Sequence, residues 1–152
     1  MKMSKPTSTF LISVRPTWAS AFFLDRDPKT IELRKGNFGA SLKPGDNIAI
    51  YATMPVAELL GIVRVLKREL LSIDRLWQTS EQGRLARVSR QQFETYYTNQ
   101  ESGIGVWVGG AELLPSPIAL SKLRQNWGDR WQPPQQIVQL SHKQMAAVGI
   151  PH

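Results

Sequence analysis

The sequence contains no cysteine and only two histidines, and each scarcity removes a class of chemistry. Without cysteine, disulfides, thiol nucleophiles and thiolate metal sites are excluded. His142 and His152 are too few and too late in the chain to predict a histidine-based triad or metal centre. The glycine-rich segment 103–110 has Val108 where the dinucleotide-binding fingerprint requires its third glycine. We therefore predict no metal and no cofactor.

Long hydrophobic runs are also missing from the start of the chain. The first 14 residues carry two lysines and too few apolar residues for a signal-peptide core or a membrane span, and Arg15-Pro16 follows directly. The sequence thus predicts a cytoplasmic protein that does not contact a membrane.

Positive charge is in excess. The chain of 152 residues has 19 Lys and Arg against 12 Asp and Glu, a formal charge of +7, with an ordinary globular content of 41% hydrophobic residues. This length suits one folded domain. The charge favours anionic partners such as RNA or DNA.

Alternating and compact apolar segments predict a set of short strands between turn residues. Gly61 lies inside one of these segments and indicates a bulge or sharp bend, while Pro115 and Pro117 are expected to end the last one. The expected strands are 10–14, 29–34, 47–52, 57–70 and 103–114.

Helical spacing and capping residues occupy the segments between and after these strands. Thr17 is expected to cap a helix over 17–24, and Ser121 one over 122–127. Two capping boxes, Ser89 with Gln92 and Ser141 with Gln144, start further helices, the second ending near Gly149. The mixture predicts an α+β fold, a small barrel with helices, in preference to a doubly wound sheet.

One expected strand carries an unusual density of charge. In the segment KTIELRK, residues 29–35, alternation places Thr30, Glu32 and Arg34 on one face and Ile31 and Leu33 on the other. Glu32 and Arg34 are close enough to pair or to bind one polar ligand. An exposed ion pair of little consequence is the alternative.

An ordered set of motifs resembles the ASCH family of the PUA-like superfamily. The set comprises a strand ending in Val-Arg-Pro at 14–16, the KTIELR strand at 29–34, a Gly-Asp turn at 45–46, the segment YATMP at 51–55 and a return strand containing Trp107. The resemblance implies a PUA-like β-barrel with flanking helices and a ligand cleft. We expect one domain over 1–152, with its core at 9–120, a helical insertion at 72–100 and a C-terminal extension at 121–152.

The same resemblance implies which residues form the cleft. The motif strand and its neighbours would supply the ligand contacts, with Arg15 and Trp18 near the mouth, although the helical spacing of Trp18 with Phe22 favours a place in the core. The implied ligand is RNA or a nucleotide-like molecule, with DNA as a second option, and the associated role is regulatory, as a coactivator-like module in transcription. The expected ligand-binding residues are Arg15, Trp18, Lys29, Thr30, Glu32, Arg34, Lys35, Tyr51 and Thr53.

An enzyme is the alternative interpretation. Some ASCH-like proteins resemble amidohydrolases of acetylated cytidine or have been linked to RNA cleavage, and Lys29 and Glu32 would then be the catalytic acid and base. In the amidohydrolases a threonine stands where this chain has Glu32, so that mechanism does not transfer directly. The sequence predicts neither the ligand's identity nor the oligomeric state.

Overall fold

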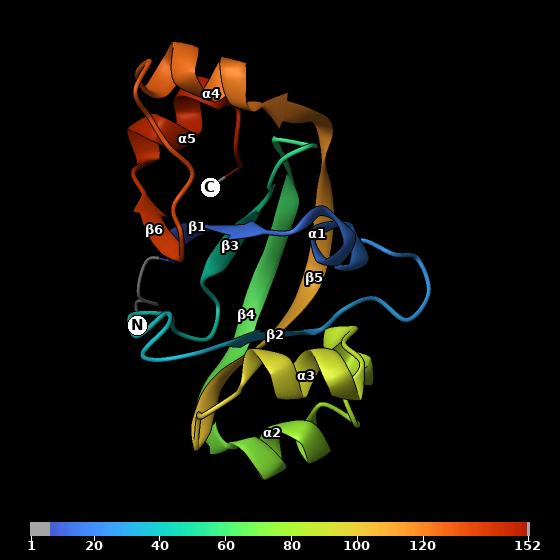
Figure 1. The fold of residues 1–152 in the computed structure, drawn as a ribbon. Coiled ribbons are helices and arrows are strands. Elements are labelled where there is room, and N and C mark those ends of the chain that lie inside the picture. The colour runs from blue at the N-terminus through green and yellow to red at the C-terminus, as the bar shows by residue number, and fades with distance from the viewer. Residues whose placement is uncertain (1–6, 152) are drawn as a thin grey trace, which may run out of the picture.

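The computed structural model describes residues 7–151 (Figure 1). Strands and helices are mixed along the chain, as the sequence predicts for an α+β protein. In order they are β1 (Thr9–Val14), α1 (Pro16–Ala21), β2 (Ile31–Arg34), β3 (Asn47–Ala52), β4 (Glu58–Ser72), α2 (Ile73–Thr79), the 3-10 helix η1 (Arg84–Ala86), α3 (Arg90–Tyr96), β5 (Ser102–Ala119), α4 (Leu120–Trp127), β6 (Ile137–Leu140) and α5 (His142–Val148).

Six strands form one sheet in the order β2-β5-β4-β3-β1-β6. β1 runs parallel to β3 and antiparallel to β6, and the remaining neighbours are antiparallel. Within residues 7–151, β2 and β6 are the two edges of this sheet and do not pair with each other. The α+β prediction is confirmed, whereas the predicted closure into a barrel is not.

Because side chains alternate between the two faces of the central strands, they pack into two cores on opposite faces of the sheet. On β1, Phe10, Ile12 and Val14 pack into one core with Ile48 of β3, while Leu11 packs into the other. The first core also contains α1, and the second contains α4 and α5. The sheet is therefore covered on both faces where β1 and β3 lie.

Apart from α1, which lies beside the middle of the long β4–β5 pair, the helices gather at the two ends of that pair (Figure 1). α2, η1 and α3 lie at one end and enclose a small third core of Leu76, Phe93 and Tyr97, whereas α4 and α5 lie at the other end. Both predicted capping boxes are present, at the starts of α3 and α5. Among the described residues no helix is long and apolar enough to cross a membrane.

Four details of the sequence prediction are wrong. β5 continues through Pro115 and Pro117, because a register shift leaves residues 114–117 outside the ladder with β4, where a missing N–H costs nothing. The sequence predicted no strand after the Pro-rich segment, whereas β6 forms there. α1 begins at Pro16, one residue before the predicted Thr17 cap, and α4 begins at Leu120, ahead of Ser121.

Candidate functional site

A cleft of about 580 Å³ lies beside β2, between β1, α1 and the helical segment that contains α3. We call it the β2 cleft. Aromatic, amide and basic side chains dominate its lining. It is lined by Ser13, Val14, Arg15, Trp18, Lys29, Glu32, Leu33, Arg34, Val88, Gln91, Gln92, Phe93, Thr95, Tyr96 and Tyr97.

The wall on the β2 side is an ion triad of Lys29, Glu32 and Arg34. Lys29 Nζ lies 3.0 Å from Glu32 Oε1, and Arg34 Nε donates to Glu32 Oε2 at 2.6 Å. Lys29 precedes the first residue of β2, which frees its side chain from the strand's alternation. Each carboxylate oxygen of Glu32 therefore already has a cationic partner.

Burial and the neighbouring charges shift the pKa of Glu32, which is only 4% exposed, in opposite directions. Burial alone would raise the pKa of the Glu32 carboxyl, but the charges and hydrogen bonds of Lys29 and Arg34 outweigh it and hold that pKa below its usual value. Glu32 is thus an ionised group that fixes two cations. A general base near neutral pH needs the opposite shift.

Both cations of the triad also anchor neighbouring segments. Lys29 Nζ donates to the carbonyl of Ala86 at 3.2 Å, and an Arg34 Nη donates to the carbonyl of Ser13 at 2.8 Å. Lys29 therefore joins β2 to η1, and Arg34 joins it to β1. The triad sets the shape of the cleft.

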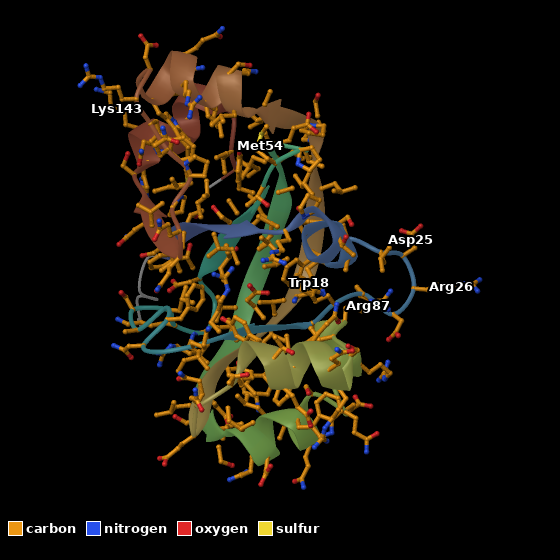
Figure 2. All side chains as sticks on the ribbon, in the orientation of Figure 1. Trp18, Asp25, Arg26, Met54, Arg87 and Lys143 are labelled. Carbon is orange, nitrogen blue, oxygen red and sulfur yellow. The ribbon has the colours of Figure 1, made fainter. Side chains whose placement is uncertain are left out.

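Two aromatic side chains of the lining are Trp18, which is half-buried and packs against the first core, and Tyr96. The Trp18 indole N–H donates to the carbonyl of Arg87 at 2.8 Å, which ties α1 to the helical segment (Figure 2). Tyr96 is 37% exposed and carries the Lys35 ammonium 4.6 Å from its ring centre. Burial raises the pKa of the Tyr96 hydroxyl, so this group is neutral near pH 7.

Helix α3 supplies a part of the site that the sequence reading missed. Gln91, Gln92 and Thr95 lie along the cleft, and the Tyr97 hydroxyl donates to the carbonyl of Arg34 at 3.1 Å. The capping box at Ser89 could have given a signal, because it fixes where this helix begins. Which face of the helix meets β2 depends on tertiary packing.

The nine predicted binding residues fall into three groups. Arg15, Trp18, Lys29, Glu32 and Arg34 line the β2 cleft. Tyr51 and Thr53 line a second cleft, on the other side of β1, which Arg15 also reaches. Thr30 and Lys35 line neither, although Lys35 lies over Tyr96 at the rim of the first.

The acidic and histidine side chains of the described residues are dispersed. Within residues 7–151 no three His, Asp or Glu side chains come together in a way that could hold an ion. Glu32, the acidic residue of the β2 cleft, is committed to Lys29 and Arg34.

The fold is similar to those of several solved structures. The crystal structure of ASCH from Zymomonas mobilis superposes with a TM-score of 0.83 at 26% identity, covering 93% of this chain and 94% of that one. A point mutant of the Zymomonas protein gives 0.79 at 27% identity, covering 91% and 92%. The N-terminal domain of Staphylothermus marinus McrB shares the fold alone, with a TM-score of 0.60 at 12% identity over 97% of both chains. No protein-family model and no curated protein matches the sequence.

The open six-stranded sheet, with helices at both ends and a cleft beside β2, defines an α+β domain. Its similarity to the Zymomonas ASCH structure over nearly the whole chain supports an ASCH domain, in agreement with the resemblance of the sequence motifs.

Proposed function

We propose that this chain is an RNA- or nucleotide-binding module whose ligand occupies the β2 cleft. The observation that carries the proposal is the combination of accessible aromatic rings, amide side chains and basic groups around one cavity of nucleotide size. Aromatic rings stack on bases, amides pair with base edges, and basic groups neutralise phosphates.

The similarity to ASCH structures supports a domain of the nucleic-acid-binding type. The excess of positive charge supports an anionic partner. A regulatory role rests on the family resemblance alone.

Each part of the cleft has its own task in this proposal. Tyr96 and Trp18 provide the stacking surfaces, with Gln91 within the same cavity for the polar edge of a base, while the side-chain oxygen of Gln92 accepts from the backbone N–H of Ser89. Arg15, which is exposed, and Lys35 at the rim meet phosphate groups. The ion triad holds the wall in place, because its charges are already paired.

A hydrolase that uses Lys29 and Glu32 is the second candidate, and their 3.0 Å contact favours it. Their environment favours the binding role, since both oxygens of Glu32 accept from cations and its pKa is lowered. Electrophoresis of labelled RNA incubated with the wild type and with Glu32→Gln separates the two. Cleavage that disappears in Glu32→Gln would establish the hydrolase.

The test of the binding role is a titration of single-stranded RNA, duplex RNA and single-stranded DNA across a salt series. Tyr96→Leu removes a stacking ring, and we expect RNA affinity to fall by about 1–3 kcal/mol, the usual contribution of one stacked base. Tyr96→Phe keeps the ring and should bind as the wild type does.

Arg26→Gln is the matched charge control. Arg26 lies on the loop before β2 and points away from the molecule (Figure 2). Equal and weak binding of all three nucleic acids, unchanged by Tyr96→Leu, would mean that net charge alone attracts them and would refute the proposal.

A further inference from the structure

A second cleft of about 670 Å³ lies on the other side of β1 from the β2 cleft. We call it the strap cleft, because the segment 132–135 forms one side of it. It contains no acidic side chain. Its lining is Ser13, Arg15, Tyr51, Thr53, Met54, Leu120, Arg124, Gln132, Pro133, Pro134 and Gln135.

The polar groups of the strap cleft suit an anion. Two guanidinium groups, three hydroxyl groups and two amides line it without a carboxylate to compete for them. Arg124 is fixed in place, since its Nε donates to the carbonyl of Trp131 at 3.0 Å and an Nη to Gln132 Oε1 at 3.1 Å. Burial raises the pKa of Tyr51 against the opposing charge of Arg124, so its hydroxyl remains a donor near pH 7. The fixed guanidinium of Arg124 is a good partner for phosphate.

The two clefts share one wall. Ser13 and Arg15 line both. The carbonyl of Ser13 accepts from Arg34 of the β2 cleft, while its hydroxyl donates to the carbonyl of Pro134 in the strap at 2.6 Å. Arg15, the exposed N-cap residue of α1, is the charged residue that lines both clefts.

We propose that the strap cleft is a phosphate subsite for the nucleotide adjoining the one in the β2 cleft. A strand would then cross over Arg15, with one nucleoside beside Trp18 and Tyr96 and the neighbouring phosphate at Arg124 and Tyr51. The smallest ligand that uses both clefts is a dinucleotide. This inference rests on the proposed function, because it takes the nucleoside to lie in the β2 cleft.

The probes are uridine, uridine 3′-monophosphate and the dinucleotide UpU, titrated into isotopically labelled protein and followed by NMR. We expect UpU to bind at least about tenfold more tightly than uridine, the gain from one charge-assisted phosphate contact. The monophosphate shows whether a terminal phosphate is enough or a diester is required. Either result with a gain over uridine supports a phosphate subsite.

Arg15→Gln and Arg124→Gln should each remove about tenfold of the UpU affinity, and Arg124→Gln, which lies outside the β2 cleft, should leave uridine binding unchanged. Each should also reduce the slope of log K against log salt by about 0.7, the value for one phosphate contact on a single strand. Arg124→Lys keeps the charge and should retain most of the affinity. Arg26→Gln removes the same charge far from both clefts and should change nothing.

The two proposals fail in different ways. If Tyr96→Leu abolishes RNA binding while UpU binds no better than uridine and both arginine variants are neutral, the β2 cleft stands and the phosphate subsite is wrong. If uridine does not bind but inorganic phosphate shifts the Tyr51 and Arg124 resonances, the anion site stands and the β2 nucleoside site is wrong. Should Arg124→Gln unfold, the affinity of the wild type for UpU relative to uridine decides.

Discussion

At the scale of single residues, the ion triad is the most consequential arrangement in the molecule. One carboxylate, Glu32, compensates two cations, Lys29 and Arg34, in a place that water scarcely reaches. A buried ion pair gains little over an apolar substitute, but removing one partner leaves uncompensated charge and is costly. In this triad the loss of Glu32 would leave the charges of Lys29 and Arg34 without their carboxylate partner.

We therefore expect Glu32→Ala to lower the free energy of unfolding by about 3–5 kcal/mol, measured by urea denaturation at pH 7. Glu32→Gln should cost less, because it keeps oxygen and shape. Glu69→Ala is the control, since Glu69 forms an exposed pair with Lys67 and should change stability by under about 1 kcal/mol. Equal effects of Glu32→Ala and Glu69→Ala would show that the triad does not stabilise the fold.

The lowered pKa of Glu32 also predicts an acid effect. A carboxyl with a lower pKa in the folded state contributes stability above its unfolded pKa of about 4.3, and that contribution is lost as the pH falls through the folded pKa. The stability advantage of the wild type over Glu32→Gln should therefore shrink as the pH falls below about 4. Paired urea denaturations at pH 7 and pH 3 measure it, and a constant difference would contradict the assignment.

Much of this pairing could be predicted from local spacing. Glu32 and Arg34 are two apart on a strand, and this alone predicts their contact. The contacts of Lys29 with Ala86 and of Arg34 with Ser13 join distant segments, which no local pattern encodes. For the same reason the sequence placed Tyr51 in the β2 cleft, whereas the structure places it beside Arg124 in the strap cleft.

At the scale of elements, Gly61 makes the close packing of β4 possible. The register of β4 shifts against both neighbours at this residue, as the predicted bulge requires. A Cβ at Gly61 would collide with the carbonyl oxygen of Glu112 and lie 2.6 Å from the Phe23 ring. The backbone oxygen cannot move aside without breaking the sheet.

Gly61→Ala should consequently destabilise the protein by at least about 2 kcal/mol, through overpacking against backbone. Gly109→Ala is the matched control on β5, where the added Cβ would meet only the Leu66 side chain at 3.4 Å. Thermal unfolding followed by circular dichroism compares the two. Similar transition temperatures for both variants would mean that β4 can shift to make room.

The elements missed from the sequence share a physical cause. β6 has only four residues, follows a Pro-rich segment and is defined by its pairing with β1. The passage of β5 through Pro115 and Pro117 depends on the register of β4. Capping boxes were predictable because they are local, and both are present.

At the scale of the whole molecule, basic residues are spread over the surface, whereas the proposed ligand contacts lie in the two clefts. Arg26 and Lys143 lie at distant points of the surface and point outward (Figure 2). At physiological salt the Debye length is about 8 Å, so remote charges act weakly on a ligand in a cleft. Local geometry should then matter more than net charge.

The double variant Arg26→Gln/Lys143→Gln removes two of the seven excess positive charges. We expect less than about a twofold loss of RNA affinity at 0.15 M salt, and a larger loss at low salt where screening is weak. Fluorescence anisotropy at both salt concentrations provides the comparison. A large loss at 0.15 M would show that binding follows net charge.

The pairing of the first and sixth strands has a consequence for synthesis. β1 lies between β3 and β6, so its second edge stays open until residues 137–140 have left the ribosome. Until then the apolar strand TFLISV exposes a free hydrogen-bonding edge, a hazard for aggregation. Ser13, the wall between the clefts, is fastened to Pro134 in that same late stage. We expect a nascent chain that stops before β6 to depend on chaperones.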